Sequence, residues 1–307
     1  MTSHDLSWMQ AQERTRSLAA SRRLEVEHLA LARAAGRIVA SDIARTAAGS
    51  HVSGEAMVAL ESGQVLTPAR LALVASLGLA TLPVSRRPSV AVYTVGDDLV
   101  APGMPLPVGH RFDSTRELLM GLLRSDGLEP TAWPRLPDDP VQLEIAVRDA
   151  ACAFDLVIVC GDNTVCDPSP LAALIGRFGR LEFGSIKSDS NCSAVLGSVD
   201  QALVLGMPFA PAAALSSWMT LGRALIDGMQ GRREARRRWF GRLVSPLPAS
   251  STFVPVRLDH DNGSLSVQPL VGVPSLDILA MSDGLAVLPD ASPRTAGDIV
   301  EVMPHGG

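Results

Sequence analysis

The sequence is short of positive charge. Its 307 residues include 27 lysines and arginines against 32 aspartates and glutamates, which gives a formal net charge of −5. A single one of these basic residues is a lysine, Lys187. Nucleic-acid partners require a basic surface that neutralises phosphates, so the charge balance argues against a protein that binds DNA or RNA. A bias of arginine over lysine commonly reflects genome composition, but it makes Lys187 a residue to locate.

Long apolar runs are also missing. No stretch of about 18 uncharged apolar residues occurs, so we expect no membrane-spanning helix. The first residues, Met1 to Asp5, lack the basic and then apolar order of a signal peptide. The four cysteines follow no framework spacing, which in a chain of this length favours reduced thiols. Together these features predict a cytoplasmic protein.

Apolar residues nevertheless make up 47% of the chain, enough for the cores of two or three compact units. Residues 6–45 carry apolar side chains at mixed helical spacings, and we expect this region to be helical with a break near Gly36. Residues 46–64 are small and turn-rich, and they mark a candidate boundary. A helix is then expected to begin with Thr67 as its N-cap and Pro68 as its first residue, and to end at Gly78.

From Pro88 onward, short apolar strands alternate with helices. We expect strands at residues 89–93, 129–133, 156–159 and 202–206, and helices at residues 113–126, 141–153 and from 211 to about 229. This alternation predicts an α/β domain with a doubly wound, mostly parallel sheet, in which helices cover both faces. Ligands bind such sheets at the carboxyl ends of the strands. The loops after Tyr93 and Val159 are therefore candidate walls of a pocket.

The last part of the chain changes character again. The arginine-rich residues 231–241 predict a solvated linker, with an anion-binding patch as the alternative. Strands are expected at residues 252–258, 264–269, 285–288 and 299–302, and Asn262-Gly263 indicates a hairpin turn. The predicted organisation is a helical and linker region at residues 1–87, an α/β domain at residues 88–235 and an all-β domain at residues 236–307.

Several segments match the motifs of one family, in the same order. Residues 67–78 resemble the helix before its ligand-binding domain, residues 95–103 its S-T-G-D-E-L…P-G motif, and residues 112–115 its Y-D-S-N motif. Asp138-Asp139 matches an aspartate pair of the family, although such a pair is more often the N-cap and first turn of a helix. Residues 275–302 are similar to its terminal β-barrel. The chain therefore resembles the MoeA-type molybdopterin molybdenumtransferases, which include the E domain of gephyrin.

The resemblance implies a molybdopterin-binding-type, three-layer α/β/α domain and a C-terminal β-barrel. Members of the family bind adenylylated molybdopterin, insert molybdate to form molybdenum cofactor, and form homodimers. The resemblance further implies that Asp97 and Asp98 hold Mg²⁺, and that Asp97 is the catalytic residue if the protein is active. The candidate ligand-binding residues are Thr94, Gly96, Asp97, Asp98, Asp113, Ser114, Gly161, Asp162, Asn163, Thr164, Lys187 and Pro208.

Other segments depart from the family's pattern. Its N-terminal signature, F-D-N-S-A-M-D-G-Y-A, falls on residues 52–61, where Val58 replaces the second aspartate. The lid-like domain that the family inserts before the helix at residues 67–78 is expected to be missing. The family's K-P-G-K-P loop falls on residues 189–193, which contain no lysine and one aspartate. A small gap in this alignment would instead place Lys187 in the loop.

The loops expected to hold the pterin and its phosphate are altered too. The family's S-G-G-V-S-V-G-D falls on residues 160–167, where Asp162 puts a negative charge in place of the second glycine. Its L-P-G-N-P-V-S falls on residues 207–213, which keep both prolines and lose the Gly-Asn between them. Scaffold residues are thus retained while contact residues are lost, as when a fold is used for a different ligand.

Three hypotheses follow. In the first, the chain is a divergent MoeA-like protein without transferase activity that binds a pterin-like ligand or a protein partner. In the second, it is an active transferase with a reduced site made of Asp97, Asp98, Asp113, Ser114, Thr164 and Lys187. In the third, Cys160, Cys166 and Cys192 border one pocket and form a thiol nucleophile or a metal site. Against the third hypothesis, a free cysteine is commonly a small buried hydrophobic residue.

Overall fold

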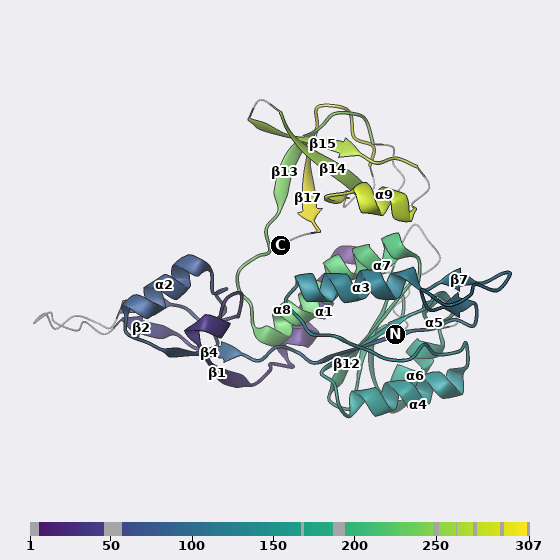
Figure 1. Ribbon diagram of the computed structural model, residues 1–307, viewed down its shortest axis with the longest axis horizontal. Helices are drawn as coiled ribbons and strands as arrows, with labels where there is room; N and C mark the ends of the chain where they lie inside the picture. The colour runs from purple at the N-terminus through teal and green to yellow at the C-terminus, as the bar shows by residue number, and fades with distance from the viewer. Residues whose placement is uncertain are drawn as a thin grey trace, which may run out of the picture. The chain divides into compact units, whose positions relative to one another are not determined.

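The computed structural model describes residues 6–45, 57–166, 169–186, 194–247, 252–261, 263–272, 275–288 and 292–305 (Figure 1). The chain divides into two compact units. Unit 1 comprises Met1–Arg14, Ser89–Arg223 and Arg236–Gly307, and unit 2 comprises Thr15–Pro88 and Ala224–Ala235. Within the described residues, no helix has the length and apolar character that crossing a membrane requires.

A six-stranded sheet forms the centre of unit 1, with the strand order β10-β11-β12-β9-β5-β8. Four strands run parallel: β12 (Ala202–Met207), β9 (Leu156–Cys160), β5 (Val90–Thr94) and β8 (Thr131–Ala132). The edge strand β10 (Gly179–Phe183) pairs antiparallel with β11 (Val195–Val199), and β11 pairs antiparallel with β12. Every residue of β5, β9 and β12 is buried, as expected for central strands with both faces covered.

Helices cover both faces of this sheet, which confirms the predicted three-layer α/β/α architecture (Figure 1). One face carries α3 (Ser114–Ser125) and α7 (Pro211–Ser217), and the other carries α4 (Pro140–Ala151) and α6 (Pro170–Phe178). The short helix α5 (Asp162–Val165) follows β9 directly. After α7 the chain makes a π-helical turn, Trp218–Gly222, and continues as α8 (Arg223–Gln230).

Side-chain caps explain where these helices begin. Asp113 accepts a hydrogen bond from the backbone N–H of Arg116 at the start of α3. Asp139 accepts from the N–H of Val141, and Pro140 is the first residue of α4. Such caps satisfy backbone donors that the first turn of a helix leaves free. The capping interpretation of Asp139 is therefore confirmed.

The antiparallel strands β10 and β11 were not predicted from the sequence. The first three residues of β10 are exposed and the strand lies at the sheet edge, so it shows no buried apolar run. Two glycines permit this pairing. A Cβ atom at Gly179 would lie 1.9 Å from the backbone oxygen of Ser198, and one at Gly197 would lie 2.5 Å from the oxygen of Arg180. The pairing of β10 with β11 thus depends on the close approach of their backbones at these glycines, and no hydrophobic pattern marks it.

The C-terminal strands form a closed barrel with the order β13-β15-β14-β16-β17, which confirms the predicted β-barrel. The strands are β13 (Trp239–Leu243), β14 (Phe253–Asp261), β15 (Ser264–Pro269), β16 (Gly284–Val287) and β17 (Ile299–Pro304). The helix α9 (Leu276–Met281) lies between β15 and β16 in the chain. Gly263 has a φ of 79° in the tight turn from β14 to β15, where the sequence predicts the hairpin. The strand β13 was not predicted.

Unit 2 is built from short elements. Its strands pair antiparallel, β1 (Val26–Ala30) with β4 (Thr81–Ser85) and β2 (Ile43–Arg45) with β3 (Met57–Leu60). The 3₁₀ turn η1 (Leu31–Arg33) follows β1. Thr67 caps α2 (Pro68–Ser76), as predicted.

The prediction that residues 6–45 are helical is correct for α1 (Trp8–Ala20) and wrong beyond it. Residues of β1 alternate between exposed and half-buried, a period-two pattern that apolar residues at mixed spacings concealed. Pairing with β4, more than fifty residues later in the chain, decides the outcome. Contacts between distant segments here override local propensity.

The arginine-rich segment supplies internal ion pairs. Arg236 lies 2.6 Å from Asp126 and Arg238 lies 3.4 Å from Glu301, both within unit 1. In unit 2, Arg232 lies 3.8 Å from Asp227. These three side chains are therefore engaged with carboxylates of the protein.

Candidate functional site

Three parallel strands of unit 1 end at the same edge of the sheet. The pairing register places Thr94 of β5 and Met207 of β12 on either side of Cys160 of β9. The loops that follow these residues carry most of the candidate site residues predicted from the sequence. This edge is the place where open α/β sheets bind ligands.

Thr94 and Asp113 are brought together as a buried pair. The Thr94 hydroxyl donates to Asp113 Oδ2 over 2.5 Å, while Asp113 Oδ1 caps α3. Both side chains are buried. Ser114 is the first residue of α3. The pair therefore joins the end of β5 to the start of α3, and both of its polar groups are already engaged.

The next loop holds Gly96, Asp97 and Asp98. The Gly96 N–H donates to the backbone oxygen of Leu136, which fixes this loop beside residues 136–139. Asp97 and Asp138 then exchange long hydrogen bonds, each accepting from the other's backbone N–H, at 3.3 and 3.4 Å. Asp98 instead pairs with Arg111 over 2.8 Å.

These carboxylates do not fit a Mg²⁺ site in this arrangement. Mg²⁺ requires near-octahedral oxygen ligands at short distance. The side chain of Asp97 accepts from Asp138, whereas that of Asp98 is held by the guanidinium of Arg111. Among the residues that the structure describes, no three His, Cys, Asp or Glu side chains group as a metal site.

The turn after β12, Met207-Pro208-Phe209, is held by hydrogen bonds from other segments. The Gly161 N–H donates to the Met207 oxygen over 3.1 Å, and the Cys160 thiol donates to the Pro208 oxygen over 3.2 Å. Asp162 Oδ1 accepts from the Phe209 N–H over 2.8 Å. The hydroxyl of Thr115 donates to the Phe209 oxygen over 2.7 Å. The protein itself therefore satisfies the backbone groups of this turn.

The ring of Phe209 is buried beneath the guanidinium group of Arg111. The residue is only 3% exposed, and the guanidinium carbon of Arg111 lies 4.4 Å from the ring centroid. Arginine over an aromatic face is a favourable cation–π contact. Because Arg111 also pairs with Asp98, its charge is directed at groups of the protein.

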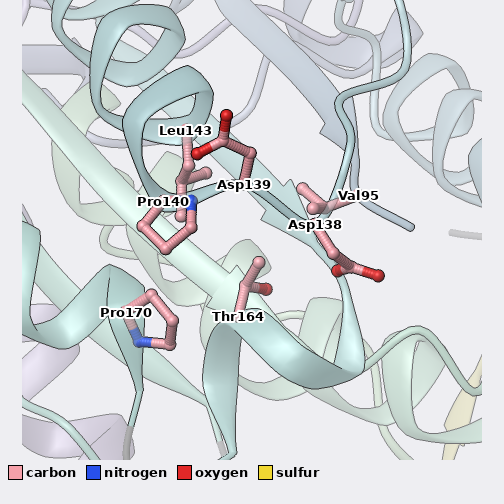
Figure 2. A pocket seen from close by; sticks show the side chains of 7 residues that line it. All are labelled: Val95, Asp138, Asp139, Pro140, Leu143, Thr164 and Pro170. Atoms are coloured by element: carbon pink, nitrogen blue, oxygen red, sulfur yellow. The ribbon is translucent and has the colours of Figure 1, made fainter. Parts of the chain in front are cut away.

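The opposite side of the edge contains a pocket of about 130 Å³ (Figure 2). Its lining comes from the loop after β5, the start of α4, the helix α5 and the first residue of α6. The lining residues are Val95, Asp138, Asp139, Pro140, Leu143, Thr164 and Pro170. Figure 2 shows Pro140, Asp139 and Leu143 grouped together, with Thr164 and Pro170 below them in the view. The pocket thus combines an apolar wall with two carboxylates and one hydroxyl.

Gly161 directly follows β9 and packs against two residues that line the pocket, Val95 and Thr164. A Cβ atom there would lie 3.0 Å from the Cβ of Val95 and 3.1 Å from the hydroxyl of Thr164. That hydroxyl donates to the Gly161 oxygen over 2.6 Å. A side chain at this position would press on Val95 and Thr164, and the helix α5 begins at the next residue.

The cysteines that the structure describes do not assemble into a thiol site. Cys160 is fully buried, and burial, followed by the charges of Asp113 and Asp162, raises the pKa of its thiol well above the usual value. A reactive cysteine needs the opposite shift. Cys166 is disulfide-bonded, so the expectation of four reduced thiols is wrong. Cys192 lies outside the described residues, as do Lys187 and the side chain of Asn163.

The sequence did not single out three residues that shape this edge. Phe209, Arg111 and Thr115 each contact a loop far away in the chain. Phe209 offered one signal, since it replaces the glycine in the L-P-G-N-P motif. Val58, which replaces a family aspartate, lies in β3 of unit 2 and is 46% exposed.

Comparisons with known proteins agree on one family. A family model described as "Probable molybdopterin binding domain" matches residues 91–227. The Haemophilus influenzae molybdopterin molybdenumtransferase is 32% identical over 180 residues, which are 59% of this chain and 45% of that protein. The Mycobacterium tuberculosis molybdopterin molybdenumtransferase 2 is 29% identical over 273 residues, covering 83% of this chain and 65% of that protein.

The fold agrees as well. The crystal structure of a molybdopterin biosynthesis MoeA protein from Pyrococcus horikoshii matches with a TM-score of 0.78 at 18% identity, and covers 96% of this chain and 99% of that chain. Residues 91–227 thus match a molybdopterin-binding domain, and the chain is similar to MoeA-type proteins. Its matches span 45% and 65% of the two curated relatives' lengths, so it aligns with less than two thirds of either MoeA-type protein.

Proposed function

We propose that this MoeA-like protein acts in molybdenum cofactor biosynthesis by binding a pterin-type ligand without inserting molybdenum into it. The single observation that carries the proposal is the charge at the carboxyl edge of the sheet. Asp97, Asp98, Asp113 and Asp162 lie there, and Arg111, the described arginine packed over the edge, pairs with Asp98. Molybdate and phosphate are anions, and inserting one into a phosphate-bearing ligand requires donors or cations that can hold them.

The pocket in Figure 2 suits the head group of a pterin. A pterin ring is flat and presents an amino group beside a ring N–H, two adjacent donors like those of a guanidinium. A carboxylate accepts such a pair with two parallel hydrogen bonds. Asp138 and Asp139 each already use one carboxylate oxygen, for the Asp97 N–H and the Val141 N–H, and in this proposal their other oxygens accept from the pterin. Val95 and Leu143 supply apolar contact for the ring. In this proposal the pocket holds the pterin ring and no transfer step follows.

A titration with a fluorescent pterin tests this binding mode. Asp138→Asn keeps the shape of the side chain but turns one acceptor into a donor, so we expect the Kd to rise by about tenfold or more. The control is Asp149→Asn, because Asp149 is an exposed residue of α4 and lies outside the pocket. It should bind as the wild type does. An unchanged Kd in Asp138→Asn, or no saturable binding by the wild type, contradicts the proposed ligand.

The alternative function is an active transferase that uses Asp97 and Asp98 with Mg²⁺. It would require Asp98 to release Arg111 and Asp97 to turn away from the Asp138 N–H. Both contacts are exposed and cost little to break, so the alternative is set apart from the first proposal by the assay of molybdenum insertion.

We also propose that the protein is a homodimer. Support comes from an exposed loop, residues 101–110, whose Met104, Leu106 and Val108 are 60%, 46% and 102% exposed. Large apolar side chains gathered on one exposed loop commonly mark a contact surface. Native mass spectrometry of the full chain reports the number of subunits, and a monomer at micromolar concentration contradicts the assignment.

A further inference from the structure

The turn after β12 carries an inference about ligand class that rests on the proposed function. We propose that Asp162 is a built-in anion that excludes phosphate-bearing ligands from the site and selects pterins without a phosphate group. The residue follows β9 within one position of Gly161, and its carboxylate reaches across to the end of the neighbouring strand β12.

The backbone N–H of Phe209 already has an acceptor. Asp162 Oδ1 accepts from the Phe209 N–H at 2.8 Å, the distance of a strong charge-assisted hydrogen bond. A backbone N–H at a strand end is the kind of donor that a phosphate oxygen takes. Here a carboxylate oxygen takes it, and an incoming phosphate would have to displace a group that is covalently attached and already in place.

The backbone oxygens of the turn are paired as well as this N–H. The remaining polar groups of the turn are engaged too: the oxygens of Met207, Pro208 and Phe209 accept from Gly161, Cys160 and Thr115. Opening the turn would leave several of these buried groups unpaired at once. Each unpaired buried group costs free energy, so the bonds support one another.

The carboxylates near the turn would also repel a phosphate. Asp113 lies beneath the same edge, and the raised pKa of the Cys160 thiol reflects burial first and then the fields of Asp113 and Asp162. Arg111 lies over Phe209 but is shared with Asp98. A phosphate placed beside Asp162 would therefore meet negative charge, and the guanidinium of Arg111 is already paired with Asp98.

In this proposal the ligand binds in the pocket of Figure 2, which Val95 and Thr164 help to line. The carboxylates of this pocket accept hydrogen bonds and repel anions. The ligand class that fits both the pocket and the turn is a pterin bearing N–H donors and no phosphate.

Calorimetric titration with inorganic pyrophosphate tests the exclusion on the full-length protein. The wild type should show no saturable binding. Asp162→Ala releases the Phe209 N–H and removes the charge, so its affinity for pyrophosphate should exceed that of the wild type by about tenfold or more. Asp162→Asn removes the charge but keeps an oxygen that accepts from the N–H. It should gain much less than Asp162→Ala.

The matched control is Glu117→Gln, which removes one negative charge from the exposed face of α3 and leaves the turn intact. Equal gains in Glu117→Gln and Asp162→Ala would show that only net charge matters and would overturn the inference. Equal gains in Asp162→Asn and Asp162→Ala would overturn it as well. If Asp162→Ala does not fold, the wild-type titration still decides, because saturable pyrophosphate binding at this edge contradicts the exclusion.

Different results would contradict the exclusion of phosphate and the proposed function. A wild type that binds pyrophosphate but not pterin contradicts both. A wild type that inserts molybdenum contradicts the proposed function whatever the pyrophosphate result. A wild type that binds pterin and pyrophosphate together contradicts the exclusion alone.

Discussion

Replacing Asp126 by alanine should lower the free energy of unfolding by about 3–5 kcal/mol. The Asp126 carboxylate is 2% exposed and accepts from Arg223, Arg236 and the indole N–H of Trp218, at 3.0, 2.6 and 2.8 Å. Arg223 also donates to the backbone oxygens of Pro304 and His305. Without Asp126, two largely buried guanidinium groups and an indole N–H lose their acceptor together.

Urea unfolding followed by tryptophan fluorescence measures this loss. The control is Asp98→Asn, which breaks the exposed pair with Arg111, whose side chains are 43% and 50% exposed. Exposed pairs contribute at most about 1 kcal/mol, so this variant should unfold nearly as the wild type does. A loss in Asp126→Ala no larger than in Asp98→Asn would mean that the cluster does not stabilise unit 1.

The second large effect is a loss of stability in acid that depends on His305. Burial, followed by the positive charge of Arg223, lowers the pKa of His305 to about 4 from 6.5. Its Nε2 lies 2.7 Å from the Ser282 hydroxyl, and its buried Nδ1 has no hydrogen-bond partner among the described residues. The folded protein therefore favours the neutral imidazole.

Between pH 6.5 and 4 the unfolded chain binds a proton at His305 that the folded chain does not. Stability from this group is complete above the unfolded pKa and is lost as the pH falls toward the folded pKa. From pH 7 to pH 4.5 the wild type should lose about 2 kcal/mol more than His305→Leu, after an allowance for partial exposure of the ring. Unfolding midpoints at the two pH values measure the difference. Parallel losses in both proteins would show that His305 does not titrate in this range.

The scaffold could be predicted from the sequence because its signals are local. The buried runs at β5, β9 and β12 and the cap Asp139 were recognised where they occur. The elements that were missed depend on distant partners. The strand β1 is defined by pairing with β4, and the edge strand β10 by the approach of glycine backbone to β11.

The candidate site was likewise predicted only in part. The sequence indicated that Asp162 removes anion-binding chemistry, but its hydrogen bond to Phe209 joins residues 47 positions apart and no local pattern encodes it. Arg111 over Phe209 is a contact of the same kind. Asp97 and Asp98 were predicted as joint metal ligands, yet their side chains take different partners, Asp138 and Arg111. Side-chain direction is decided by the neighbours that folding supplies.

The proposal of pterin binding without molybdenum transfer is tested most directly by a molybdenum-insertion assay. The purified full-length protein is given adenylylated molybdopterin, molybdate and Mg²⁺, and the molybdenum cofactor formed is measured over time. The Haemophilus influenzae relative serves as the positive control. We predict cofactor formation no faster than in the reaction without protein. Turnover within about tenfold of the relative's rate would contradict the proposal, because the carboxylate-lined edge would then support the transfer it is proposed to have lost.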